Sequence, residues 1–396
     1  MKATFAPVTG QLPYPRAMDA SARQHRSRQR LLTELQQVPG RTRTELAEAT
    51  GLSRSAVAET VSRLLTDGLL QEVTPAPVPG RRGRRPAVLV LTPPGGVVVG
   101  LDLGHSHLAA AIADGTGRLL ASDRQQADVD RDALGALDAA GRLVTDLLDG
   151  LGLGRLDVRC AAVGLPGPVD LSRTVRSRSI LGGWVDLDPA REFGNRLGVP
   201  VQVGNDADLG ALGELRFGAA RGHADVLYIK ASHGIGAGLV LGGRSYRGAT
   251  GLAGEIGHTQ VPGAADWCRC GNRGCLETVV SVEQVRRQLQ LVRPGSAGLL
   301  SPTPQDPVST RILREAGRTI GQVVAGLCNA LNPGLVLLGG ELGASGEPFV
   351  SGVRDAVARY AQPANAAALV VRPAGLGLEA ELMGAVALAL TGSRSG

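Results

Sequence analysis

The sequence has few aromatic residues, few cysteines and no long hydrophobic run. Aromatic residues make up 3 % of the 396 residues, although 43 % are hydrophobic. Leucine, valine, alanine and isoleucine must therefore fill the cores, and a chain of this length normally divides into two or three domains. The 56 glycines indicate many tight turns between strands and helices.

Nothing in the sequence has the pattern of a secretion signal or a membrane span. Residues 1–19 have no apolar core, and the apolar stretch at 88–103 is interrupted by Pro93, Pro94 and Gly95. A helix that spans a membrane needs about 20 apolar residues. Three of the five cysteines fall within eight residues, which is not the spread of a disulfide scaffold. The sequence therefore predicts a cytoplasmic protein with no membrane partner.

The excess of positive charge is confined to the first quarter of the chain. Residues 1–95 hold 14 of the 42 basic and 7 of the 36 acidic residues, a balance of +7. The rest of the chain holds 28 basic and 29 acidic residues, a balance of −1. This asymmetry predicts that the first quarter contacts a polyanion, and a solvated basic surface is the alternative.

Residues 23–92 follow the pattern of a winged helix-turn-helix domain. Thr42 and Glu45 form a capping box that opens a helix over Arg43–Thr50. After a glycine turn, Ser53 caps a second helix over Arg54–Asp67, which the spacing places in the DNA major groove. An earlier helix is predicted from four apolar residues that share one face: Leu31, Leu32, Leu35 and Val38.

The second helix and a basic tip supply the predicted DNA contacts. Two apolar strands, Leu69–Val73 and Ala87–Leu91, flank the tip, and arginine on such a tip suits the narrow minor groove. A solvated linker is the alternative for the tip. The predicted DNA-binding residues are Ser53, Arg54, Ser55, Glu59 and Arg63 on the helix, and Arg81, Arg82, Arg84 and Arg85 on the tip. Residues 1–22 lack any periodicity and are predicted to form a flexible tail.

Residues 93–396 contain two copies of one strand pattern. The first copy has strand-like segments at 97–103, 108–113 and 119–122, and the second at 226–231, 235–241 and 244–247. In both copies the segments are separated by turns that contain glycine. This duplication predicts two related lobes with a ligand in the cleft between them. Further strands and helical stretches follow, which predicts a largely α/β unit. The helical stretches lie at 133–151, 189–198, 282–292 and 309–331.

Seven short motifs follow one another along this region. They are LDLG at 101–104, GLPGPV at 164–169, GNDA at 204–207, GEIGHT at 254–259, CRCGNRGCLE at 268–277, NP at 332–333 and LGG at 338–340. In their order and spacing, residues from about 28 to 390 resemble the ROK family of repressors and sugar kinases. The resemblance implies an actin-like ATPase fold, a duplicated ribonuclease H-like fold in two lobes. Lobe one is expected at about 93–205 plus the C-terminal helix, and lobe two at about 206–380.

Three cysteines bracket a glycine-rich loop. Cys268, Cys270 and Cys275 follow His258, which precedes the first of them by ten residues. Three thiolates and one imidazole complete a closed tetrahedral site of the structural type. In the family the corresponding set binds zinc, so the resemblance implies structural Zn²⁺ on these four residues. A cluster of reduced, buried thiols is the alternative.

The resemblance also implies a sugar site. Sugar hydroxyls are held by planar side chains that accept and donate hydrogen bonds. Asp206 matches the general base of the family's kinases and is a catalytic residue only if the chain is a kinase. Taken singly, the Asn205-Asp206 pair has a turn as its alternative, and Glu255 a charge at a helix start. The implied sugar-binding residues are Gly167, Asn205, Asp206, Glu255, His258 and Glu277.

The phosphate loops argue against ATP and Mg²⁺ binding. Kinases of the family carry an Asp-x-Gly-Gly-Thr loop, but here His105 replaces the second glycine, where backbone N–H groups must approach phosphate. The second glycine-rich loop, 232–238, also carries a histidine, His233. Family kinases usually lack the DNA-binding domain. The sequence therefore favours a repressor that answers to a sugar or phosphosugar and binds double-stranded operator DNA as a homodimer or tetramer. The alternatives are an ATP-dependent hexose kinase that also binds DNA, and a regulator controlled by a protein partner.

Overall fold

The computed structural model describes residues 27–35, 38, 40–66, 70–73, 87–91, 95–176, 179–292, 300 and 306–392. The chain divides into two compact units, residues 1–94 and 95–396. The predicted tail at 1–22 and the four arginines of the predicted tip lie outside the described residues. Among the helices that the structure describes, none is long and apolar enough to cross a membrane.

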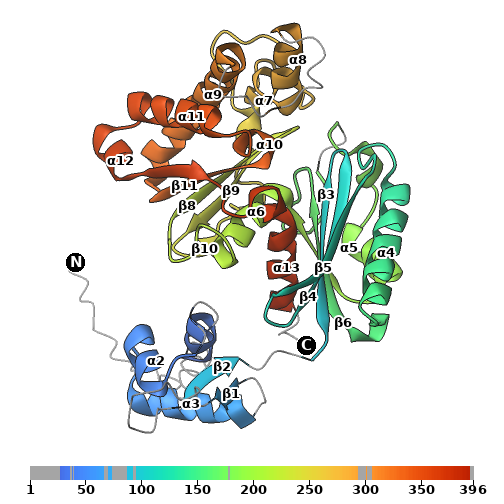
Figure 1. Cartoon of the computed structure of the whole chain (residues 1–396), viewed down its shortest axis with the longest axis vertical. Helices are drawn as coiled ribbons and strands as arrows, with labels where there is room; N and C mark the ends of the chain where they lie inside the picture. Colours follow the sequence, from blue (N-terminus) through green and yellow to red (C-terminus); the bar gives the residue numbers. More distant parts are fainter. Residues whose placement is uncertain are drawn as a thin grey trace, which may run out of the picture. The chain divides into compact units, whose positions relative to one another are not determined.

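The first unit combines helices with a two-stranded ribbon (Figure 1). A helix at 27–35 is followed by α2 (Arg43–Thr50), α3 (Arg54–Thr66), β1 (Leu70–Val73) and β2 (Val88–Leu91). The two strands pair antiparallel. The apolar faces of these elements meet in one core, which consists of Leu31, Leu35, Leu46, Val57, Val61, Leu64, Leu70 and Leu89.

The predicted capping box at the start of α2 is confirmed. The Thr42 hydroxyl accepts the Glu45 N–H at 3.3 Å, and the Glu45 carboxylate accepts the Thr42 N–H at 2.7 Å. Val38 still donates its N–H to the Glu34 carbonyl at 2.9 Å, but the prediction that its side chain belongs to the buried helical face is wrong, because Val38 is 44 % exposed and lies in a bend. Val38 precedes Pro39, and a residue before proline is disfavoured in a helix.

Lobe one of the second unit is a five-stranded sheet in the order β5-β4-β3-β6-β7. Its strands are β3 (Val97–Gly104), β4 (His107–Asp114), β5 (Leu119–Gln126), β6 (Val158–Leu165) and β7 (Val201–Asn205). The first three pair antiparallel, and β6 and β7 continue parallel to β3. Helices α4 (Ala133–Gly150) and α5 (Pro189–Leu197) share a core with one face of this sheet. β3 is buried along its whole length, which explains its continuous apolar run.

Lobe two repeats this topology in a sheet of order β10-β9-β8-β11-β12. Its strands are β8 (Val226–Ala231), β9 (Ile235–Leu241), β10 (Arg244–Ser245), β11 (Leu335–Gly339) and β12 (Val370–Pro373). Again three strands are antiparallel and two are parallel, so the predicted duplication is confirmed. The remaining helices of this lobe are α7 (Leu276–Val279), α8 (Val282–Val292), α9 (Pro307–Leu331), α10 (Gly340–Gly343), α11 (Glu347–Tyr360) and α12 (Pro363–Ala368).

Two helices join the lobes. α6 (Asp206–Arg216) packs on β8 and β9 of lobe two, and α13 (Ala380–Gly392) packs on β3 and β6 of lobe one. The two helices also pack on each other, and glycine permits their close approach. A Cβ atom at Gly384 would lie 1.8 Å from the Leu209 carbonyl oxygen. This pair of helices holds the base of the cleft between the lobes.

Candidate functional site

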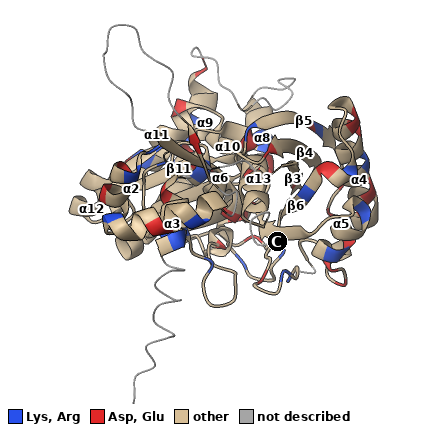
Figure 2. Cartoon of the chain, turned by 90° about the horizontal axis from the view of Figure 1, so that it is seen from below, with Lys and Arg blue, Asp and Glu red and all other residues tan. Residues whose placement is uncertain are grey.

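The predicted DNA-reading face lies on α3 of the first unit. The Ser53 hydroxyl caps this helix by accepting a backbone N–H at 3.2 Å, and Arg54 and Ser55 are exposed at its first turn. Glu59 and Arg63 are also exposed, and they pair with each other at 2.7 Å. Figure 2 shows basic and acidic positions interspersed along α3. Arg54 is therefore the basic residue of this face that carries no ion pair among the described residues.

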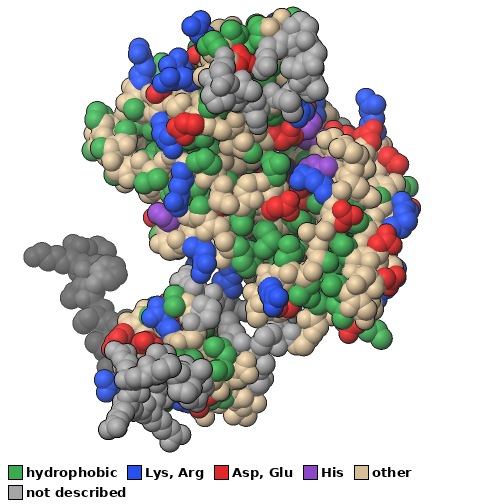
Figure 3. All heavy atoms as spheres, in the orientation of Figure 1, with side chains coloured by type: hydrophobic (Ala, Val, Ile, Leu, Met, Phe, Trp, Pro, Cys, Tyr) green, Lys and Arg blue, Asp and Glu red, His purple; other side chains and the backbone are tan. Residues whose placement is uncertain are grey.

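The second unit contains a cleft between its lobes, at the carboxyl ends of β3, β7 and β8. Ligands of α/β folds bind outside the carboxyl ends of parallel strands. Figure 3 shows histidine side chains close together on the surface of this unit, beside acidic ones. The six residues that the sequence predicts for a sugar all line this cleft: Gly167, Asn205, Asp206, Glu255, His258 and Glu277.

Asn205 has a structural role as well as its place in the cleft. Its side-chain oxygen caps α6 by accepting the N–H groups of Ala207 at 2.9 Å and Asp208 at 3.2 Å. Its amide donates to the Gly167 carbonyl at 3.0 Å, which ties the loop after β6 to the start of α6. An amide has two N–H donors, so one remains for a ligand.

Asp206, the first residue of α6, is paired with a lysine that the sequence analysis missed. One carboxylate oxygen accepts the Ala207 N–H at 2.8 Å, and the other accepts from the ammonium of Lys230 on β8. Both side chains are largely buried, and both residues line the cleft. The cleft floor therefore carries an ion pair and not an isolated carboxylate.

Behind this pair lies a buried acid–phenol pair. The Tyr228 hydroxyl donates to the Glu381 carboxylate on α13 at 2.9 Å, and both side chains are buried. Burial raises the pKa of Glu381 to about 7, against the lowering effect of Lys230. The joint between α13 and β8 thus contains a carboxyl group that titrates near neutral pH.

The wall of the cleft on lobe two is acidic. Burial raises the pKa of Glu255 to about 7, and the charges of Asp206, Asp208 and Glu277 act in the same direction. Asp208 of α6 does not line the cleft, but burial likewise raises its pKa to about 6, although the guanidinium of Arg247 lies 3.0 Å away. A neutral, hydroxyl-rich ligand suits such a wall better than an anion does.

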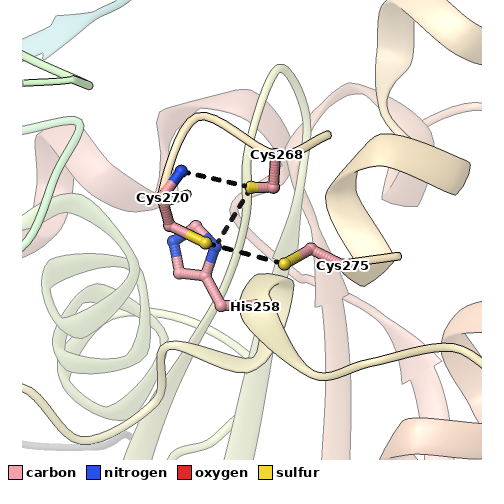
Figure 4. A group of neighbouring side chains, drawn as sticks. All are labelled: His258, Cys268, Cys270 and Cys275. Atoms are coloured by element: carbon pink, nitrogen blue, oxygen red, sulfur yellow. Dashed lines mark hydrogen bonds between the residues drawn. The ribbon is translucent and has the colours of Figure 1, made fainter. Parts of the chain in front are cut away.

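Four side chains gather beside the cleft in the arrangement of a metal site (Figure 4). The donor atoms of His258, Cys268, Cys270 and Cys275 all lie within 4.8 Å of one another. The sulfur atoms of Cys270 and Cys275 are 3.7 Å apart, and Cys268 Sγ is 3.6 Å from His258 Nδ1. Zinc–sulfur bonds of about 2.3 Å in a tetrahedron place two sulfur atoms about 3.8 Å apart. The donor set and its spacing therefore fit a four-coordinate zinc ion.

His258 connects this cluster to the cleft. Its Nδ1 faces the cluster, whereas its Nε2 lies 3.8 Å from a carboxylate oxygen of Glu255. Glu277 also belongs to both sites, because its carboxylate lies 3.1 Å from Cys268 Sγ while its side chain lines the cleft. The cluster therefore sets the positions of two predicted sugar ligands.

Comparison with known proteins decides the family. Residues 98–392 match the family model described as "ROK family", and residues 24–71 match the one described as "Winged helix-turn-helix DNA-binding". The chain belongs to the ROK family. Its ROK region spans both lobes of the second unit, and the winged helix-turn-helix lies in the first unit.

ROK relatives include both repressors and kinases. The xylose repressor of Bacillus subtilis (strain 168) is 27 % identical over 368 residues, which cover 89 % of this chain and 92 % of that protein. A crystal structure of a ROK family transcriptional regulator, a homolog of the E. coli MLC protein, has a TM-score of 0.73 at 24 % identity and covers 94 % of this chain and 96 % of its own. A ROK family glucokinase from Streptomyces griseus, solved with glucose and AMPPNP, has a TM-score of 0.66 at 30 % identity and covers 76 % of this chain and 100 % of its own.

The two loops that differ from the ROK kinase pattern face each other across the cleft. The rings of His105, after β3, and His233, after β8, have centroids 5.9 Å apart. His105 is held by Asp130 at 2.8 Å, and His233 by Glu283 at 2.9 Å. The hydrogen bond to Glu283 raises the pKa of His233. Two imidazoles with carboxylate partners thus lie in the two loops that the sequence analysis compares with phosphate loops.

Proposed function

We propose that this ROK protein is a sugar-responsive, DNA-binding repressor of carbohydrate genes. The observation that carries the proposal is the union of a winged helix-turn-helix with a ROK unit whose cleft is lined by all six residues that the sequence predicts to bind a sugar. The repressor relative matches about nine tenths of the chain, whereas the glucokinase matches about three quarters. Kinase activity alone does not account for the winged helix-turn-helix unit.

The sugar binds in the cleft through both lobes. Gly167 and Asn205 belong to the side of lobe one, and Glu255, His258 and Glu277 belong to lobe two. A sugar that contacts both sides favours the closed arrangement of the lobes, because a ligand shifts an equilibrium only by its differential affinity for the two states. That closure changes how the winged units of a homodimer meet the two half-sites of an operator.

The cluster holds one structural zinc ion through His258, Cys268, Cys270 and Cys275. Bound zinc supplies a rigid cross-link and no open coordination position for water. His258 and Glu277 are then fixed in the orientation in which they line the cleft. The site resembles the closed class of zinc site more than the catalytic class.

Phosphoryl transfer is the second candidate, favoured by the presence of Asp206 at the position of the kinases' general base. A base must accept the proton of the attacking hydroxyl. Here Asp206 already accepts from Lys230, and His105 and His233 occupy the phosphate loops. These contacts favour binding of the sugar without chemistry on it.

A gel-shift assay with the fragment upstream of the chain's own gene, run over a panel of sugars and phosphosugars, tests the proposal. We expect specific binding that one carbohydrate weakens by tens of fold, and loss of specific binding by about 1–3 kcal/mol in Arg54→Ala. A coupled assay with ATP, Mg²⁺ and the same sugars is expected to show no turnover. Turnover at about 1–100 per second, or DNA binding that no carbohydrate changes, would contradict the proposal.

A further inference from the structure

Lysine is almost absent from this chain. The 42 basic residues include only two lysines, Lys2 and Lys230, and the other 40 are arginines. Lys230 lies in β8, a strand whose other residues are apolar or aromatic, and its side chain is 13 % exposed. A buried ammonium costs free energy unless it is paired. The single departure from arginine in the described part of the chain therefore falls in the cleft.

The fold leaves space for this side chain on β8. In the sheet register, Lys230 is opposite Gly236 of β9 and Gly339 of β11, so neither neighbouring strand places a side chain beside it. The ammonium can therefore reach Asp206 at the start of α6 and line the cleft together with it. A planar guanidinium is bulkier than an ammonium and binds in a fixed fork, so arginine is not equivalent here.

Lys230 carries a positive charge. Burial would lower its pKa, but the carboxylates of Asp206, Glu381 and Asp102 around it raise the pKa well above its ordinary value. Lys230 therefore remains an ammonium, which donates hydrogen bonds and accepts none. A residue needed only to neutralise charge has no reason to line the ligand cleft.

The pair retains unused hydrogen-bonding capacity. Lys230 has three N–H donors, and among the described residues its ammonium makes one hydrogen bond, to Asp206. Asp206 accepts two hydrogen bonds and has about four acceptor positions. A sugar hydroxyl both donates and accepts, so a donor and an acceptor held side by side match it from two directions.

We infer that Lys230 binds the effector sugar directly, by donating a hydrogen bond to the oxygen of one hydroxyl group. The same hydroxyl group donates its own hydrogen bond to Asp206. The inference rests on the proposed function and makes Lys230 a specificity-determining residue for a neutral sugar. It adds a donor to a set of predicted side chains in which carboxylates are the majority. Asp206 thereby binds the hydroxyl group while its ion pair with Lys230 stays intact.

The scarcity of lysine provides a direct test. In the full chain carrying Lys2→Arg, selective ¹³C labelling at the lysine Cε leaves one NMR signal, from Lys230. D-glucose and D-xylose are titrated separately into this protein. We expect the signal to shift with one of the two sugars, in step with its binding. Saturation by a sugar that leaves the signal unmoved overturns the inference.

Calorimetry of variants tests the energetic side with the same two sugars. Lys230→Met is expected to weaken binding about 10- to 100-fold, the usual effect of removing a hydrogen bond from a charged group. Arg196→Met is the control, because Arg196 of α5 pairs with Asp138 and Glu192 in lobe one and none of these residues lines the cleft. We expect it to lower the thermal midpoint without changing sugar affinity.

The outcomes separate two failures. Wild-type binding that Lys230→Met leaves unchanged overturns the role of Lys230 and leaves the proposed function standing. A wild-type chain that binds neither these two sugars nor any sugar or phosphosugar of the gel-shift panel overturns both. If Lys230→Met does not fold, the NMR titration of the Lys2→Arg chain still decides the question, because it retains Lys230.

Discussion

Two single cysteines, one in the candidate metal cluster and one outside it, can be compared to test the zinc assignment. Cys275 belongs to the cluster, whereas Cys328 lies on α9 with its side chain buried in the core of lobe two. We expect about one zinc per chain in the wild type and in Cys328→Ser, and almost none in Cys275→Ser, by atomic emission on purified protein. Loss of a structural zinc removes folding free energy, so the thermal midpoint of Cys275→Ser should fall by about 5 °C or more. Zinc retained by Cys275→Ser would contradict the assignment.

Glu381 makes the stability of the second unit depend on pH. Its pKa is raised from 4.5 to about 7, so the folded chain holds a proton that the unfolded chain has lost between these values. The free energy of unfolding therefore falls as the pH rises from about 4.5 to 7. Glu381→Gln still accepts from Tyr228 but cannot ionise.

We expect this variant to lose less stability than the wild type between pH 5 and 7, by about 1 kcal/mol or more, because one pKa unit corresponds to about 1.4 kcal/mol. Urea denaturation at several pH values measures the difference. Parallel pH profiles for the two proteins would remove Glu381 from this role.

The residues that could be predicted are those fixed by short motifs. The cysteine spacing and the GNDA and GEIGHT motifs named residues that the fold places together. Lys230 and Glu381 could not be predicted, because their contacts join residues 24 and 153 positions apart. Their one sequence signal is a charge within an apolar run, and a solvent-exposed position explains such a charge equally well.

At the scale of elements, α6 is capped by a residue with two separable roles. Asn205 caps the helix with its oxygen and bonds Gly167 with its amide. Asn205→Ala should cost about 1 kcal/mol of stability, whereas Asn205→Ser keeps a capping oxygen and should cost little. Both variants lose the amide, so we expect both to weaken sugar binding about tenfold by calorimetry. Normal binding by Asn205→Ser would restrict Asn205 to the cap.

Element boundaries were predictable where a cap or a glycine marks them. The capping box set the start of α2, and α8 and β8 have the predicted ends. The strand predicted at 119–122 extends to Gln126, and the one predicted at 244–247 ends at Ser245. Edge strands carry polar residues on exposed faces, so their apolar pattern ends before or after their backbone pairing does.

The whole molecule combines two units, and the proposed function requires a coupling free energy between them. The duplication in the sequence predicted the two lobes, because each copy repeats the order of strands and turns. The proposed coupling between DNA and sugar leaves no such pattern, since in the proposed homodimer it depends on the difference between two arrangements. It can be measured without knowing either arrangement.

Linkage makes that measurement strict. If the effector sugar weakens operator binding by some factor, operator DNA must weaken sugar binding by the same factor, and typical factors are about 5- to 150-fold. We expect calorimetry of the sugar with and without an operator fragment to return the factor seen in gel shifts. Equal sugar affinities with and without operator would contradict any coupling between the cleft and the DNA-binding unit.

Replacing Arg81, Arg82, Arg84 and Arg85 by alanine should lower the salt dependence of DNA binding while leaving sugar affinity without DNA unchanged.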